Sequence, residues 1–248
     1  MALQRAYWNQ RFYEDPELFG TRESRFARWT LRWVRGSRKV GPLIELGAGY
    51  GRDLRFFQKK GFAARGVDAS VEAVRIGTSA DAASGARPID LAAGEALDYL
   101  KAQPTGSASV VYSNLLYNMD FTEREHLRLF QEVARVLPVG GLHCYSVRSV
   151  EDCWYGRGSP IREDTFDLRP QGGIMRFFSR SYVAFLRGRL FGKRAFTAVT
   201  EGDADFPICV LYVADVRTVG PRSTRKRPVR GSRAGGMRSA QRVLRAPR

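Results

Sequence analysis

The stretch Glu45-Leu-Gly47-Ala-Gly49-Tyr-Gly51 decides how this chain of 248 residues folds. It follows residues 40–46, which predict a short buried strand, and it precedes residues 52–60, which predict a helix. Glycines at such a junction allow a tight turn and let a ligand approach the main chain closely. The free N–H groups at the start of the helix then face a polar or anionic ligand. A glycine run is also typical of plain turns, so its spacing matters.

The glycine spacing is GxGxG, with an acidic residue two positions before the first glycine. Nicotinamide-binding loops have GxGxxG, and nucleotide hydrolases have GxxxxGK[ST], so both classes are disfavoured. Asp68 closes a second predicted strand, residues 62–68, and lies 21 residues after Gly47. A carboxylate there can accept both hydroxyls of a ribose, although an isolated Asp is equally typical of a turn. The loop and Asp68 together favour ribose binding.

The rest of the chain alternates between strand and helix patterns. Further strands are predicted at 87–92, 108–114, 142–148, 195–200 and 207–216, and helices at 70–79, 95–101, 122–137 and 179–187. Thr122 and Glu125 have capping-box spacing. Residues 150–176 form a polar stretch that predicts a loop. This order predicts a single α/β domain, with a mostly parallel seven-stranded sheet, one antiparallel strand near the C-terminus and helices on both faces.

Charge and composition divide the chain into three parts. Residues 1–38 predict a helical lead-in with aromatic anchors, residues 39–217 the α/β domain, and residues 218–248 a disordered basic tail. The net charge is +16, but eleven Lys/Arg and no Asp/Glu fall between positions 217 and 248, so residues 1–216 carry only +5. The basicity that suggests a nucleic-acid partner is therefore mostly a property of the tail.

Composition also bears on compartment. No stretch approaches the roughly 18 consecutive apolar residues of a membrane span, and the first twenty residues lack the apolar centre of a secretory signal. Cys144, Cys153 and Cys209 have no CxxC spacing, which disfavours disulfides and a metal site and favours small buried hydrophobes. We therefore expect a cytoplasmic protein that does not enter a membrane.

Several of these segments together resemble the class I S-adenosylmethionine-dependent methyltransferases. The resemblance covers roughly residues 5–216 and rests on the glycine loop, Gly66-Val-Asp68-Ala-Ser70, Gly94-Glu95-Ala96, Ser113-Asn114 and Val136-Leu-Pro-Val-Gly-Gly141. The aromatic lead-in and Gly49-Tyr-Gly51-Arg-Asp53 look most like the small-molecule branch around the tellurite-resistance and thiopurine methyltransferases. The resemblance implies a Rossmann-like doubly wound domain that transfers a methyl group from S-adenosylmethionine.

It also implies roles for individual residues. Gly47, Ala48, Gly49 and Gly51 would line the methionine part of the cofactor, above Glu45. Asp68 would hold the ribose, beside Ala69 and Ser70. Glu95 and Ala96 would flank the adenine, although the family often has Asp at the position of Glu95. Asn114 and Leu115 would lie near the sulfonium.

The acceptor side is less defined. Asn114-Leu-Leu-Tyr117 keeps the Asn and Tyr of the NPPY motif of amino-group methyltransferases but lacks both prolines, so amino transfer by that route is disfavoured. Ligands of open α/β sheets bind beyond the carboxyl ends of the strands. The candidates there for the acceptor pocket are Tyr117, Asn118, Arg148, Trp154, Tyr155 and Arg157, with an ordinary surface loop as the alternative. The arginines would suit an anionic acceptor. His126 is expected on a solvated helix face and His143 in the core, and neither is favoured as a base.

Three functions stay open from the residues. The leading hypothesis is methyl transfer to a small-molecule acceptor. The second is methylation of RNA or protein, with the Arg-rich tail holding a polyanionic partner. The third is a non-catalytic protein that binds the cofactor or interacts through its tail.

Overall fold

The computed structural model describes residues 2–35, 41–84, 88–170, 172–202 and 207–218. The predicted tail lies outside these residues, apart from Thr218. The helices are α1 (Ala2–Glu14), α2 (Arg25–Arg35), α3 (Arg52–Lys59), α4 (Val71–Ser84), α5 (Ala96–Ala102), the 3-10 helix η1 (Leu116–Asn118), α6 (Glu123–Val136) and α7 (Arg180–Arg187). The strands are β1 (Leu43–Leu46), β2 (Ala64–Asp68), β3 (Asp90–Ala93), β4 (Val110–Asn114), β5 (Leu142–Arg148), β6 (Ser159–Arg162), β7 (Thr165–Asp167), β8 (Ile174–Arg176), β9 (Phe191–Glu201) and β10 (Ile208–Arg217).

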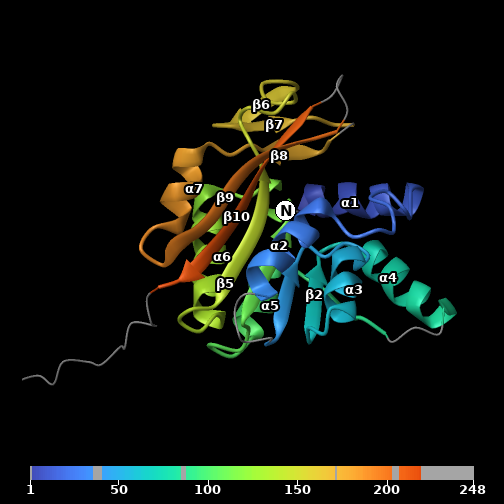
Figure 1. The fold of residues 1–248 in the computed structure, drawn as a ribbon. Coiled ribbons are helices and arrows are strands. Elements are labelled where there is room, and N and C mark those ends of the chain that lie inside the picture. The colour runs from blue at the N-terminus through green and yellow to red at the C-terminus, as the bar shows by residue number, and fades with distance from the viewer. Residues whose placement is uncertain (1, 36–40, 85–87, 171, 203–206, 219–248) are drawn as a thin grey trace, which may run out of the picture.

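The described residues form a seven-stranded sheet in the order β3-β2-β1-β4-β5-β10-β9. The first five strands of this order pair in parallel, and β10 runs antiparallel to both β5 and β9 (Figure 1). The parallel strands need helical crossovers, whereas β9 and β10 follow each other as a hairpin. This topology confirms the predicted Rossmann-like sheet with a single antiparallel strand. It brings the carboxyl ends of β1, β2 and β4 together at one edge.

Each face of the sheet is covered by helices, and a hydrophobic core lies under each layer (Figure 1). On one face, Leu100 of α5, Phe130 of α6 and Leu186 of α7 pack against the sheet. On the other, Phe26 of α2 and Phe57 of α3 pack against it. Burial on both faces explains why every residue of β1 except Glu45 is apolar.

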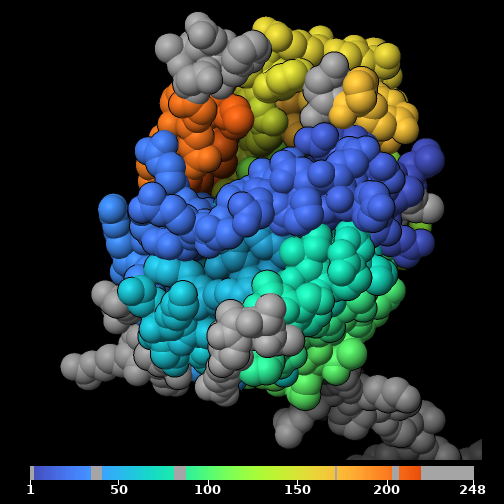
Figure 2. Space-filling model, turned by 90° about the vertical axis from the view of Figure 1, so that its right-hand side faces the viewer, coloured from blue at the N-terminus to red at the C-terminus, as the bar shows by residue number. Residues whose placement is uncertain are grey.

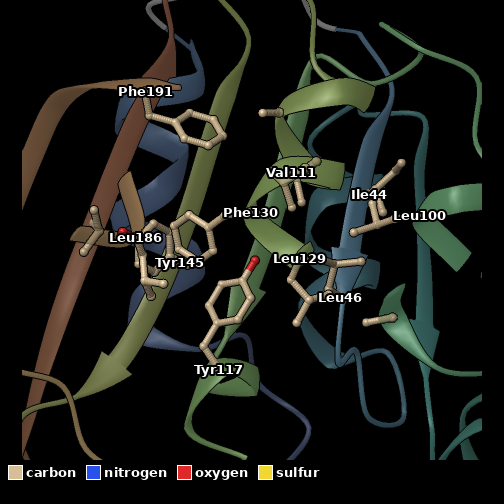
Figure 3. Close-up of a cluster of buried hydrophobic side chains, with 14 of the residues drawn as sticks. Ile44, Leu46, Leu100, Val111, Tyr117, Leu129, Phe130, Tyr145, Leu186 and Phe191 are labelled. Atoms are coloured by element: carbon tan, nitrogen blue, oxygen red, sulfur yellow. The ribbon is translucent and has the colours of Figure 1, made fainter. Parts of the chain in front are cut away.

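The core beneath α6 contains a side chain that the sequence placed at the acceptor pocket. Tyr117 rises from η1, and its ring lies among Leu129, Phe130 and Tyr145 (Figure 3). Its hydroxyl is 2.9 Å from Nε2 of His143. Tyr117 is fully buried, so it belongs to the packing of this layer.

Two local expectations were wrong. Residues 150–176, expected as a loop, contain a three-stranded antiparallel sheet, β6-β7-β8, which is too short to show a clear alternating pattern in sequence. His126, expected on a solvated helix face, is fully buried. Its Nε2 lies 2.8 Å from the carbonyl of Tyr117 and its Nδ1 3.1 Å from the hydroxyl of Tyr182, because α7 packs over this side of α6.

The capping box was predicted correctly. The Thr122 hydroxyl accepts from the backbone N–H of Glu125, and the Glu125 carboxylate accepts from the N–H of Thr122 at 2.8 Å. Within the described residues, every helix is too short or too polar to cross a membrane.

Candidate functional site

A cavity of about 460 Å³ opens at the carboxyl ends of the parallel strands. Its floor is the glycine loop and the ends of β2 and β4, and α1 lies over it. Figure 2 shows α1, in blue, crossing this face of the molecule between α4 and the segment that contains the small sheet. The N-terminal helix that the sequence presented as a lead-in is therefore part of the cavity wall.

The cavity brings together eleven of the twelve residues that the sequence assigned to the cofactor. These are Glu45, Gly47, Ala48, Gly49, Asp68, Ala69, Ser70, Glu95, Ala96, Asn114 and Leu115. The exception is Gly51, which precedes α3 at a φ of 80°. A Cβ there would lie 2.4 Å from Cδ1 of Ile89, so Gly51 is required by packing behind the loop.

Gly47 shows why the loop needs glycine at the cavity itself. Its φ is 70°, in the left-handed region that side chains with a Cβ rarely adopt. A Cβ at this position would also meet the side chain of Leu116 at 3.0 Å. The N–H of Gly47 is held by the carbonyl of Val67 at 2.9 Å, which fixes the loop onto β2.

Asp68 joins the loop to the start of α4. Its Oδ2 accepts from the N–H of Gly49 at 2.7 Å, and its Oδ1 accepts from the N–H of Ser70 at 2.8 Å. A carboxylate has about four acceptor positions, so each oxygen keeps capacity for one more donor. Burial raises the pKa of Asp68, and the two N–H groups counteract part of that rise. The arrangement is suited to a vicinal diol.

Glu45 is an acidic side chain that β1 places beneath the loop. It is 2% exposed, and its Oε2 is buried without a hydrogen-bond partner among the described residues. Burial raises its pKa well above the usual value, and the neighbouring carboxylate of Asp53 raises it further. A buried acceptor with an unmet hydrogen bond is costly unless a ligand or water supplies the donor.

A further acidic residue of the cavity, Asp53, is bonded to the residue that precedes α2. The carboxylate of Asp53 accepts from the N–H and hydroxyl of Ser24, at 2.7 and 2.6 Å, and from the hydroxyl of Tyr112 at 2.7 Å. These bonds join α3, the residue preceding α2 and β4 behind the glycine loop. The sequence indicated Asp53 only as part of the family resemblance. Its bonds could not be predicted because the partners lie 29 and 59 residues away.

The end of β4 carries backbone strain. Leu115 has a φ of 63°, which is uncommon for a residue other than glycine. Its N–H is held by the hydroxyl of Ser146 at 3.1 Å, and that hydroxyl donates to Oδ1 of Asn114 at 2.5 Å. The neighbouring strand thus fixes Asn114 and Leu115 at the cavity. Strain of this kind is characteristic of functional sites.

The six acceptor candidates separate into two groups. Asn118 and Arg148 line the cavity. Arg148 forms a bidentate pair with buried Asp152, at 2.9 and 2.6 Å, and its backbone N–H donates to Oδ1 of Asn118 at 3.1 Å. Asn118 also donates to the carbonyl of Arg176 at 2.6 Å.

The other four candidates lie away from the cavity lining. Tyr117 is in the core. Trp154 packs against the cluster under the small sheet, with Arg157 over its ring at 5.7 Å. Tyr155 is 39% exposed and donates to Asp164 at 2.7 Å. Trp154 and Tyr155, which the sequence assigned to a loop at the acceptor pocket, thus pack against the small sheet and its core.

α1 supplies cavity residues that the sequence did not single out as site residues. Nε1 of Trp8 and Nε2 of Gln4 both donate to the sulfur of Met119, at 3.0 and 3.1 Å. Gln4 also donates to the carbonyl of Ile174 at 3.0 Å, which ties α1 to β8. Phe12 packs edge-on against Tyr50 of the glycine loop. The aromatic residues of 1–38 indicated that this segment packs against the domain, but they did not indicate that it covers the cavity.

The comparisons with known proteins give a domain family that part of the chain matches and solved structures that share its fold. Residues 43–141 match the model of a methyltransferase domain family. No curated protein sequence matches the chain. Among solved structures, a S-adenosylmethionine-dependent methyltransferase from Methanosarcina mazei has a TM-score of 0.65 at 18% identity, covering 76% of this chain and 98% of that one.

A second structure is the 1,6-didemethyltoxoflavin-N1-methyltransferase of Burkholderia thailandensis, solved with 1,6-didemethyltoxoflavin and S-adenosylhomocysteine. It has a TM-score of 0.66 at 17% identity and covers 88% of each chain. A third is the geranyl diphosphate C-methyltransferase of Streptomyces coelicolor, with a TM-score of 0.57 at 14% identity, covering 77% of this chain and 76% of that one. These structures share the fold of this chain.

Proposed function

We propose, from the methyltransferase domain at residues 43–141, that this protein transfers the methyl group of S-adenosylmethionine to a small-molecule acceptor. The observation that carries the proposal is the hydrogen bond from the Gly49 N–H to the Asp68 carboxylate inside the cavity. It supports the proposal because a carboxylate suited to a vicinal diol and a glycine loop that a ligand can approach closely line the same cavity. The GxGxG spacing of this loop differs from the GxGxxG of nicotinamide-binding loops and the GxxxxGK[ST] of nucleotide hydrolases.

The residues of the cavity fit the parts of the cofactor. Asp68 holds the ribose hydroxyls on the acceptor positions that Gly49 and Ser70 leave open. Ala96 and Glu95 flank the adenine, and Arg5 lies 3.7 Å from Glu95 at the surface of this end. Gly47 lets the methionine part approach the main chain. Glu45 offers its unpaired oxygen to the ammonium group, directly or through a water.

The chain's contribution to the reaction is positioning and exclusion of water. Bound S-adenosylmethionine supplies a methyl group already activated on a positively charged sulfur. Asn114 and Leu115 are fixed beside it by Ser146. Trp8 of α1 and Met119, which follows η1, line the cavity and are bonded to each other. Orientation in a dry cavity accounts for much of the rate acceleration in transfers of this kind.

The described lining residues offer the acceptor no histidine to take up its proton. His126 and His143 are buried among aromatic rings, and burial lowers their pKa values to about 4 and about 3. Both are neutral at physiological pH and stay in the core. The acceptor atom is therefore one that reacts without a histidine base, such as a neutral nitrogen, a thiolate or an activated carbon.

The size and lining of the cavity support a small acceptor. The cavity of about 460 Å³ is within the range of small-molecule sites, and the cofactor positions take up part of it, so the space that remains suits a small acceptor. Beyond the cofactor positions its walls are mainly apolar, with Trp8, Met119, Met175 and Ile208, and they include Arg148, which Asp152 holds in place. An apolar acceptor with one anionic or polar group suits this lining.

Calorimetric titration with S-adenosylhomocysteine, with NADH as the control ligand, tests the proposal. Saturable binding of S-adenosylhomocysteine alone is the expected result. A screen of small acceptors with a labelled methyl donor then follows the labelled product. Failure of the folded protein to bind S-adenosylhomocysteine would overturn the proposal.

A further inference from the structure

One carboxylate of the cavity has no part in the proposed binding of the cofactor. Among the described residues, the carboxylates that line the cavity are Glu45, Asp53, Asp68, Glu95 and Glu201. Glu45, Asp68 and Glu95 lie at the proposed cofactor positions. The carboxylate of Asp53 already accepts three hydrogen bonds. Glu201 therefore remains for a second ligand.

The position of Glu201 is fixed by the neighbouring strand. It is the last residue of β9, opposite Ile208, and its Oε1 accepts a hydrogen bond from the hydroxyl of Tyr212 on β10. The ring of Tyr212 is itself buried against Phe26 and Trp29 of α2. Oε2 of Glu201 has no hydrogen bond to a described residue. Because Glu201 is partly buried and lines the cavity, this oxygen is available to a ligand there.

The charges around the cavity show which kind of ligand Glu201 needs. Each arginine of the described lining has a carboxylate at 2.6–3.9 Å: Arg5 with Glu95, Arg11 with Glu14, Arg52 with Asp53 and Arg148 with Asp152. Glu201 has no ion pair within the described part of the chain. Outside the cofactor positions, it is the charged group of this lining that lacks an opposite charge.

The surroundings of Glu201 favour a cation as that opposite charge. Burial raises the pKa of Glu201, and Arg25 and Arg52 offset only part of this rise. A positively charged group bound at Oε2 would stabilise the ionised carboxylate. The hydrogen bond would be charge-assisted on both sides, which is the strongest kind in proteins.

The sheet separates Glu201 from the proposed position of the sulfonium. That position lies beside Asn114 at the end of β4, and the strand order from there is β4-β5-β10-β9. Neighbouring strands are about 4.8 Å apart, so β9 lies roughly 14 Å from β4. Ile208 and Val210 of β10 line the cavity between Arg148 of β5 and Glu201. The space that leads to Glu201 thus has an apolar wall.

We propose that Glu201 binds a protonated amine of the methyl acceptor, at the end of the cavity remote from the sulfonium. The inference rests on the proposed function, since it assigns the part of the same cavity that the cofactor leaves free. A protonated amine has no lone pair, so the methyl group goes to another atom of the acceptor. The acceptor is therefore a cation with an apolar middle part, and Glu201 determines specificity and is not a base.

Ligand-observed NMR on the full chain, saturated with S-adenosylhomocysteine, tests this inference. The probes form two matched series: 2-phenylethylamine, 2-phenylethanol and 3-phenylpropanoate, and then tryptamine, tryptophol and indole-3-propanoate. Within a series the apolar part is the same, and the terminal group is a cation, a neutral hydroxyl or an anion. The variant E201Q removes the charge but still accepts the hydrogen bond of Tyr212. The matched control E123Q removes the charge of an exposed carboxylate on α6.

The amine of each series should bind the wild type and E123Q about tenfold more tightly than the alcohol does, and the acid should bind most weakly. In E201Q the amine and the alcohol should bind within about twofold of each other, because the charge that distinguishes them is gone. The affinities for the alcohols and for S-adenosylhomocysteine should be the same in all three proteins.

Equal binding of amine and alcohol by the wild type, or binding of neither, would overturn the inference and leave the proposed function intact. Tighter binding of the acids would assign the charged end of the acceptor to the cavity arginines and would also overturn it. If Glu201 serves only to hold β9 against Tyr212, E201Q will lower the thermal stability and keep the preference for amines. Failure of the wild type to bind S-adenosylhomocysteine would instead overturn the proposed function.

Discussion

The carboxylate of Asp68 accepts a hydrogen bond from the backbone N–H of Gly49, 2.7 Å away. This bond joins the end of β2 to the glycine loop that follows β1, two segments separated by 19 residues. It orients the carboxylate toward the cavity while the N–H of Ser70 holds the other oxygen. The position of the group expected to hold the ribose therefore depends on the conformation of the loop beside it.

Asp68→Ala should abolish most of the cofactor affinity. Two hydrogen bonds from a diol to a carboxylate are worth about 1.5–3 kcal/mol each, so a loss of at least about 100-fold is expected. Calorimetric titration with S-adenosylhomocysteine measures it. Asp98→Ala, which removes an exposed acid on α5, is the control and should bind normally. Unchanged affinity in Asp68→Ala, with intact circular dichroism, would exclude Asp68 from the site.

Glu45→Gln should change the way in which stability depends on pH. The folded-state pKa of Glu45 is raised well above the usual value by burial and by Asp53, so the folded protein favours the protonated form. The stability associated with this proton is fully present below about pH 4.5 and is lost as the pH rises through the folded-state pKa. Arg52 opposes the shift and Asp68 adds to it.

Gln keeps the shape of the protonated side chain but cannot ionise. The variant should therefore lose less stability than the wild type between pH 5 and pH 8, which thermal unfolding at each pH will measure. Glu14→Gln, on the exposed face of α1, is the control. Parallel pH profiles for Glu45→Gln and the wild type would mean that Glu45 is ionised throughout.

Gln4→Ala should loosen α1 over the cavity. The side chain is 4% exposed and donates to Met119 and Ile174, so the variant loses bonds that tie α1 to the residue after η1 and to β8. Each is worth about 0.5–1.5 kcal/mol, which predicts hydrogen exchange in residues 3–14 faster by roughly tenfold. Gln10→Ala, whose partner Glu14 lies on the same helix, should exchange like the wild type. Equal rates in the two variants would show that α1 is held by its aromatic contacts alone.

Tyr117 and His143 form a buried polar pair that should sensitise the fold to acid. The pKa of His143 is lowered to about 3 by burial, so its contribution to stability is present above about pH 6.5 and is lost as the pH falls toward 3. Tyr117→Phe combined with His143→Phe replaces both partners by apolar rings. The double variant should be close to the wild type in stability at pH 7 and should lose less stability on acidification to pH 4.

His143→Phe alone separates the two effects. It leaves the Tyr117 hydroxyl, fully buried, without its partner, and should cost about 1–3 kcal/mol in urea unfolding at pH 7. If the double variant and the wild type lose the same stability between pH 6.5 and pH 4, His143 does not govern the acid response.

Sequence patterning predicted most of the sheet because each strand is defined locally. Buried parallel strands such as β1 and β4 appear as short apolar runs, and the capping box of α6 needs only Thr122 and Glu125. The small sheet β6-β7-β8 was not predicted, because strands of three or four residues are too short to show an alternating pattern of apolar and polar residues. His126 was misplaced because its burial depends on α7, more than fifty residues further along the chain.

The sequence by itself determined the alternation of strands and helices in the main sheet and the residue types of the glycine loop and of Asp68, since both depend on residue types at short spacing. Only the tertiary structure decided what surrounds that loop. It placed α1 over the cavity through Gln4 and Trp8, turned Tyr117 into the core and kept Arg148 at the cavity. The reason is physical: these positions follow from packing between segments far apart in the chain, and the local periodicity of apolar residues does not predict which distant segments pack together.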